Sequence, residues 1–151
     1  MKSTLSKILL AVLLLCAVTS PSCKKNESSP ETKSLSDAKA LWEASNISNY
    51  SFKSKMNCFC VDVSKYEITV TNKIITSVKN EQGQNIQFAN KNLKTIDELF
   101  EYLQNSLEKN PYKATIIYDQ TLGFPTSIYI DFDQQMIDEE IGYTISDFVK
   151  K

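Results

Sequence analysis

Apolar and polar residues alternate through the segment from Tyr50 to Cys60. Successive side chains of a β-strand point to opposite faces, so this period of two is typical of a half-buried strand. Two further alternating segments, 66–70 and 74–78, flank the pair Asn72-Lys73, and a two-residue hairpin explains that spacing. The first half of the chain is therefore expected to contain antiparallel strands.

Two other segments show a helical period. Ser36 is expected to cap a first, short helix, with apolar residues at helical spacing as far as Ala44. Thr95 and Glu98 form the capping-box pattern Thr-x-x-Glu at the head of a second helix, which is expected to end before Asn110.

The remaining alternating segments complete the expected fold. Strands are expected at 114–118, 126–132 and 140–148, and 86–88 can add a short one. The order is thus helix, three strands, helix, three strands. Connections of hairpin length favour an α+β fold, in which an antiparallel sheet of about six strands carries both helices on one face.

The N-terminal segment resembles an export signal. Lys2 and Lys7 accompany an unbroken apolar run from Ile8 to Val18. At about 1.5 Å per residue, this run is too short to cross a hydrocarbon core of about 30 Å. It has the proportions of the apolar region of a signal peptide.

The junction Ser22-Cys23 resembles the lipobox of bacterial lipoproteins, although Ser20 and Pro21 replace the aliphatic and small residues of its stricter form. The resemblance implies cleavage before Cys23 and attachment of diacylglycerol to its sulfur. Two or more acyl chains give lasting membrane attachment. Lys24 stands where some lipoproteins carry the Asp that retains them in the inner membrane, which favours the outer membrane. The alternative is an ordinary signal peptide followed by a coincidental cysteine.

Three regions follow from these patterns: a signal peptide at 1–22, a lipidated cysteine with a flexible polar tether at 23–34, and one α+β domain at 35–151. Removal of the signal peptide takes away two Lys and no acid, and leaves 15 Lys, 18 acidic residues and a net charge of −3. The chain has no Arg and no basic stretch between aromatic residues, so nucleic acid is not an expected partner.

The absence of His excludes several chemistries. Nucleophilic systems of the Ser-His-Asp and Cys-His types need an imidazole, and the usual catalytic zinc sites rely on His ligands. The three Gly of the chain make a phosphate-binding loop implausible. No catalytic residue, cofactor or metal site is assigned, and the sequence favours a protein that is not an enzyme.

The motifs of the domain occur in a distinctive order. A Trp-bearing helix is followed by Tyr50-Ser51-Phe52 and Cys58-Phe59-Cys60. The later motifs are Ile96-Asp97-Glu98-Leu99-Phe100, Tyr118-Asp119, Gly123-Phe124-Pro125, Asp131 and Asp138-Glu139-Glu140. In this order, and over nearly all of the domain, they resemble an uncharacterised family of bacterial secreted proteins and lipoproteins, domain-of-unknown-function family 6174. The resemblance supports location and fold, and it implies no reaction.

If Cys23 is acylated, Cys58 and Cys60 are the only two thiols left in the mature chain, from which Cys16 is removed with the signal peptide. Residues i and i+2 of an ideal strand have Cα atoms about 6.6 Å apart, near the upper limit for a disulfide, so a bridge requires the strand to kink or end there. A disulfide suits an oxidising compartment. Reduced core cysteines, thiol exchange, and a copper(I) site that includes Met56 are the alternatives.

An acidic group near the C-terminus is the other candidate site. Carboxylates close together in one loop can bind Ca²⁺, although the EF-hand pattern is absent. Recognition of a partner and a solvated loop that protects a strand from unwanted pairing are the alternatives. The residues are Asp131, Asp138, Glu139 and Glu140, with Asp133 beside them.

The sequence thus favours a lipid-anchored protein of the cell envelope, with a non-enzymatic binding or accessory domain. Its expected partners are the membrane, through the anchor, and an unidentified envelope protein. The alternative is an exported thiol-redox or soft-metal protein that acts through Cys58 and Cys60.

Overall fold

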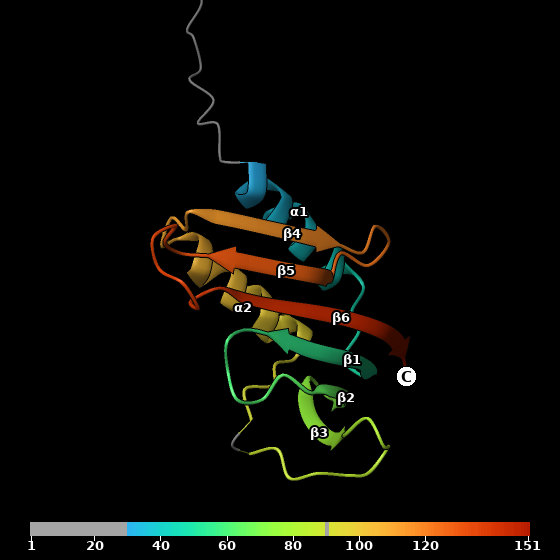
Figure 1. The fold of residues 1–151 in the computed structure, drawn as a ribbon. Helices are drawn as coiled ribbons and strands as arrows, with labels where there is room; N and C mark the ends of the chain where they lie inside the picture. Colours follow the sequence, from blue (N-terminus) through green and yellow to red (C-terminus); the bar gives the residue numbers. More distant parts are fainter. Residues whose placement is uncertain (1–29, 90) are drawn as a thin grey trace, which may run out of the picture.

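The computed structural model describes residues 30–89 and 91–151, with side chains from Leu35 onward. Two helices and six strands follow one another in the expected order (Figure 1). They are α1 (Pro30–Ala44), β1 (Tyr50–Asn57), β2 (Lys65–Thr71), β3 (Ile74–Lys79), α2 (Ile96–Leu107), β4 (Lys113–Tyr118), β5 (Pro125–Asp131) and β6 (Ile141–Lys150).

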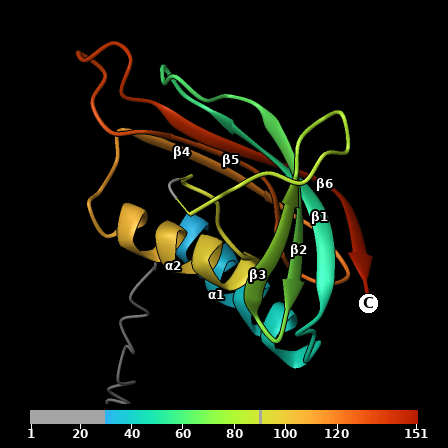
Figure 2. The same cartoon turned by 90° about the horizontal axis from the view of Figure 1, so that it is seen from below.

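The six strands form one antiparallel sheet in the order β3-β2-β1-β6-β5-β4. Each half of the chain supplies three consecutive strands, and the halves join where β1 pairs with β6. Both helices cover the same face of the sheet, as Figure 2 shows. The α+β fold predicted from the sequence is therefore confirmed.

Local sequence signals account for two of these elements. Asn72 and Lys73 join β2 to β3 with φ values of 50° and 65°. A hairpin turn with both central residues at positive φ matches the twist of the strands it joins. At the start of α2, Thr95 accepts a hydrogen bond from the Glu98 amide, and the Glu98 side chain accepts one from the Thr95 amide. The predicted hairpin and capping box are both confirmed.

The core lies between the sheet and the two helices. Trp42 on α1 meets Tyr50 on β1 edge to face, with ring centroids 5.4 Å apart. The Tyr50 hydroxyl accepts a hydrogen bond from the Ile96 amide at 3.0 Å, so it satisfies one of the free donors at the start of α2. Burial of Tyr50 raises its pKa, because the phenolate would lose its hydration. The first strand thus positions both helices.

Gly123 allows α1 to lie close to the turn between β4 and β5. Its φ is +78°, and a Cβ atom there would lie 2.2 Å from the carbonyl oxygen of Ala38. Only glycine meets both requirements, positive φ and close approach of another backbone, without strain.

Three predicted boundaries and one predicted short strand were wrong. The first helix begins at Pro30 rather than after a cap at Ser36, so part of the assigned tether is helical. Pro is favoured in the first turn of a helix, where its missing N–H is not needed. The first strand ends at Asn57, before the two cysteines. Residues 86–88 form no strand, since the chain makes one bridge at Asn85 and then leaves the sheet. The last strand extends to Lys150.

Candidate functional site

A cavity of about 460 Å³ opens on the helix-bearing face of the sheet, at the end where β1 finishes and β2 begins. Three neighbouring strands form its floor, because Ser54 pairs with Tyr66 on β2 and Met56 pairs with Tyr143 on β6. These side chains share the face that carries the core: Ser54, Tyr66 and Tyr143 are buried, and Met56 is half-buried. The cavity therefore extends the core toward solvent.

Two connections form the walls of the cavity. The first is the β1–β2 loop, residues 58–64, which contributes Cys60, Asp62 and Ser64. The second is the connection from β3 to α2, which contributes Gln87, Ala89, Lys91, Asn92 and Leu93. Because antiparallel pairing places the ends of β1 and β3 at the same end of the sheet, segments about 30 residues apart in sequence face each other.

A network of three polar side chains joins these two walls. The Lys91 ammonium lies 2.6 Å from the Asp62 carboxylate and donates to the Tyr66 hydroxyl at 2.8 Å. That hydroxyl lies 2.9 Å from each Asp62 oxygen and donates to the carboxylate. The Lys91 ammonium also lies 4.8 Å from the centroid of the Tyr66 ring. Each polar group of the network thus has a partner within it.

The charges of the network stabilise each other. The hydrogen bond from Lys91 is the main cause that lowers the pKa of Asp62 to about 2, and Tyr66 and the Ser64 amide act in the same direction. Asp62 in turn raises the pKa of Lys91. Both groups are therefore charged at neutral pH, and together they add no net charge to the wall.

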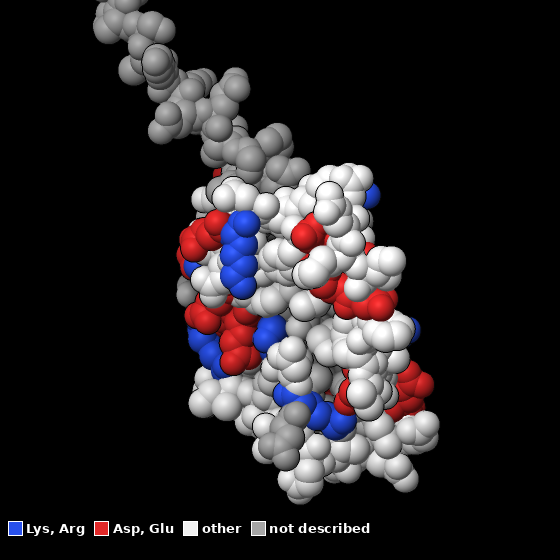
Figure 3. Space-filling model, turned by 60° about the vertical axis from the view of Figure 1, so that its left-hand side comes forward, with Lys and Arg blue, Asp and Glu red and all other residues white. Residues whose placement is uncertain are grey.

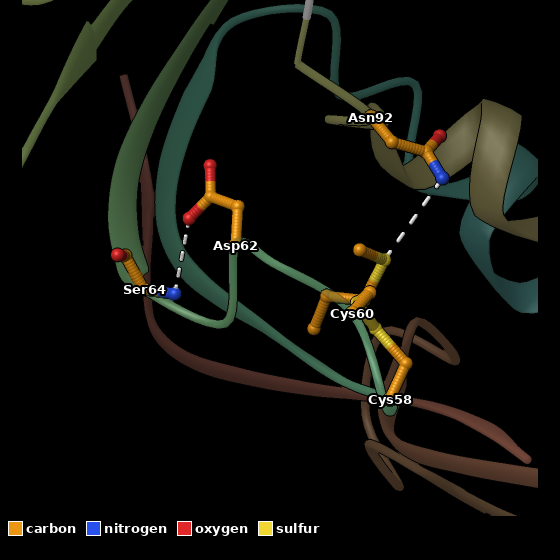
Figure 4. The surroundings of a disulfide bond; sticks show 6 residues. Cys58, Cys60, Asp62, Ser64 and Asn92 are labelled. Atoms are coloured by element: carbon orange, nitrogen blue, oxygen red, sulfur yellow. Dashed lines mark hydrogen bonds between the residues drawn. A yellow bond between two sulfur atoms is a disulfide. The ribbon is translucent and has the colours of Figure 1, made fainter. Parts of the chain in front are cut away.

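The opposite part of the wall is largely apolar. Met56, Leu93 and the ring of Tyr143 line it, and the side-chain amide of Asn92 lies 3.9 Å from the Met56 sulfur. Figure 4 shows Asn92 extending toward this wall from the second connection. Burial raises the pKa of Tyr143 to about 12, so its hydroxyl is neutral. The cavity thus combines an apolar side with a polar, charge-balanced side.

The predicted cysteine pair lies at the edge of this cavity. The sulfur atoms of Cys58 and Cys60 are in contact, with Cα atoms 5.2 Å apart (Figure 4). The strand ends at Asn57, which allows this approach. Cys60 lines the cavity, and Phe59 between the two cysteines is 81% exposed. The expected strand face shared by Met56, Cys58 and Cys60 does not continue past Asn57, so the geometry argued for copper(I) is not present.

The acidic residues lie at the same end of the sheet but outside this cavity. Asp131 ends β5, and the other three belong to the loop before β6. The Glu139 carboxylate accepts hydrogen bonds from the amides of Phe132 and Asp133, so it closes its own loop. Asp138 has a φ of 82°. Among residues 30–89 and 91–151, no group of three or more Asp, Glu, Cys or His side chains is placed to hold a metal ion.

Sequence reasoning missed the network of Asp62, Tyr66 and Lys91. Lys91 is 29 residues from Asp62, and only the pairing of the strands brings their connections together. The remaining site prediction, Cys23, lies outside the described residues.

The charged surface around this end of the molecule is mixed in sign. Acidic and basic side chains are interspersed on the face shown in Figure 3. In the described part of the chain, neither helix is long and apolar enough to cross a membrane. Taken together, the sheet, the two helices on one of its faces and the cavity define a two-layer α+β unit with a small cavity at one end of its sheet.

Comparison with known proteins places this unit in a family. The model described as "Family of unknown function (DUF6174)" matches residues 34–150, and the chain belongs to that family. No curated protein and no solved structure matches the chain.

Proposed function

We propose that this chain is an exported bacterial lipoprotein, held to the membrane through acylated Cys23, whose domain binds a small ligand and catalyses no reaction. The N-terminal pattern supports export and anchoring: an apolar run too short to span a bilayer ends close to a cysteine. Lys24 supports the outer membrane as the destination. The domain would then act in the cell envelope, alone or with an envelope protein.

The observation that carries the binding function is the cavity between the two connections. Its volume of about 460 Å³ falls within the range of small-molecule sites. An apolar wall with a few convergent polar groups is the usual composition of such sites. Asp62, Lys91 and Tyr66 supply those polar groups.

An exported thiol-redox protein is the second candidate. The contact between the Cys58 and Cys60 sulfur atoms favours a disulfide, and Cys60 lines the same cavity. A bound thiol would therefore lie close to an exchangeable bond. Against this candidate, the pair does not open a helix whose N-terminus would lower a thiol pKa.

Two experiments test these proposals. Membrane fractionation and mass spectrometry should find the native chain cut before Cys23, acylated and membrane-bound, and should find Cys23→Ser without acyl groups and released from the lipid. An intact N-terminus in a cytosolic extract would refute the location.

Incubation with a small dithiol and a disulfide substrate distinguishes the redox candidate. Catalysed thiol–disulfide exchange that Cys60→Ser abolishes would favour the redox function over binding alone.

A further inference from the structure

The charged side chains of the cavity wall are already paired. Of the charged residues described, Asp62 and Lys91 line the cavity, and their charged atoms lie 2.6 Å apart. We propose that this pairing makes the cavity selective for an uncharged amphipathic ligand, with an aliphatic or aromatic body and an amide or hydroxyl group. This inference rests on the proposed binding function.

The hydrogen-bonding capacity left in the network fits such a polar group. The Lys91 ammonium has three donors and uses two, toward Asp62 and Tyr66. A carboxylate has about four acceptor positions, and the Asp62 carboxylate accepts hydrogen bonds from Lys91, Tyr66 and the Ser64 amide. One donor and one acceptor position therefore remain on neighbouring groups. An amide or a hydroxyl can use both at once.

A charged ligand gains no net charge attraction from this network. A carboxylate that accepts from the free Lys91 donor also lies close to the Asp62 carboxylate, and an ammonium that donates to Asp62 also lies close to Lys91. In either case the ligand gives up its hydration in a partly enclosed site without a compensating unpaired charge, which is costly. The side chains of Asp62 and Lys91 are 38% and 29% exposed, so water compensates only in part.

The other wall accommodates the body of the ligand. Met56 and Leu93 offer flexible aliphatic surface, and Tyr143 offers a ring. A thioether adapts to ligands of different shape and makes favourable contacts with aromatic rings. The cavity therefore suits an aromatic or branched aliphatic group on this side.

The test uses three probes with one carbon skeleton: 3-phenylpropanamide, 3-phenylpropanoate and 3-phenylpropylammonium. Their dissociation constants are measured at pH 7 by NMR titration of the full mature chain in a non-ionic detergent. The neutral amide should bind with a dissociation constant of about a millimolar, which is reasonable for so small a ligand. Both ions should bind at least about tenfold more weakly.

Two variants should reverse this preference in opposite directions. Asp62→Asn leaves Lys91 unpaired, so 3-phenylpropanoate should become the tightest probe. Lys91→Gln leaves Asp62 unpaired, so 3-phenylpropylammonium should become the tightest. Asp147→Asn is the matched control, because it removes a carboxylate that lies 2.7 Å from Lys53 outside the cavity. It should leave all three constants unchanged.

The outcomes separate the inference from the function on which it rests. Binding of all three probes with equal affinity, or an order that neither variant changes, would overturn charge selection and leave the binding site in place. Absence of binding by every probe to the native chain would overturn both. Circular dichroism and melting temperature show whether each variant retains the fold. Any change in the dissociation constants of the Asp147→Asn control measures how much the loss of a carboxylate outside the cavity alters probe binding.

Discussion

Trp42 on α1 donates its indole N–H to the Asp97 carboxylate on α2, at 3.1 Å and across 55 residues of sequence. The indole is almost fully buried, and this bond satisfies its single polar group. Asp97 also lies 3.7 Å from Lys73 in the β2–β3 turn. One carboxylate in the first turn of α2 thus contacts the other helix and a hairpin.

Replacement of Asp97 should test how much this bond contributes. Asp97→Ala leaves the buried indole N–H without a partner, and we expect a loss of about 1–3 kcal/mol in the free energy of unfolding. Lys73→Ala removes only an exposed ion pair, and its loss should be below about 1 kcal/mol. Urea unfolding followed by Trp42 fluorescence measures both. Equal losses in the two variants would show that the indole bond contributes little.

The two glycines at positive φ should respond differently to alanine. Gly83 and Gly123 have φ values of +76° and +78°, so both substitutions carry the same backbone penalty of about 1–2 kcal/mol. A Cβ at Gly83 meets nothing within 4 Å, whereas at Gly123 it meets the Ala38 carbonyl oxygen at 2.2 Å. Gly123→Ala should therefore lower the melting temperature clearly more than Gly83→Ala. Similar shifts would mean that α1 moves away without cost.

The pKa of Asp62 predicts a particular dependence on acid. Its folded-state value of about 2 lies below the ordinary value of 3.8, so the folded chain holds this proton less tightly than the unfolded chain. The stabilisation is therefore complete above about pH 5 and is lost as pH falls toward 2. Because Asp62 is partly exposed, it amounts to at most about 1 kcal/mol.

Two measurements check this prediction. The difference in unfolding free energy between the native chain and Asp62→Asn should be constant from pH 5 to pH 7, should decrease as pH falls through 2, and should vanish below it. In an NMR titration, the Asp62 carboxyl should have its midpoint near 2, and Lys91→Gln should move the midpoint back toward 3.8. A native midpoint already near 3.8 would contradict the ion pair.

The contact between Cys58 and Cys60 predicts a thiol count. The mature chain should take up no alkylating reagent at these positions before reduction, and two equivalents after it. Because a bridge would close a loop of only three residues, Cys58→Ser combined with Cys60→Ser should reduce stability by no more than about 2 kcal/mol. Uptake of reagent without reduction would show that the sulfurs are close but not bonded.

The sequence predicted those features whose physical causes lie within a few residues. The Thr95–Glu98 capping box and the Asn72-Lys73 turn depend on local hydrogen bonds and backbone angles, and both were predicted correctly. Alternation of apolar and polar residues predicted the strands, because one face of this sheet is buried and the other is not. The antiparallel fold class followed from these local signals.

The cavity was beyond such reasoning. Asp62 and Lys91 stand in polar connections without a distinctive spacing, and only the packing of the sheet brings them together. The Glu139 carboxylate was expected as a candidate binding group, but it accepts hydrogen bonds from its own loop. A carboxylate in a sequence therefore indicates chemistry only when its hydrogen-bond partners are known.

The central position of β6 has a consequence for how the chain reaches its native state. β6 is the last strand in sequence and pairs with β1, the first of the six. A chain that emerges N-terminus first can therefore pair β1, β2 and β3, and then β4 with β5, but β1 stays an open edge until residues 141–150 follow. Pairings between such distant segments form slowly. Truncation of the C-terminal ten residues should therefore divide the sheet in two, whereas loss of an outer strand would only narrow it.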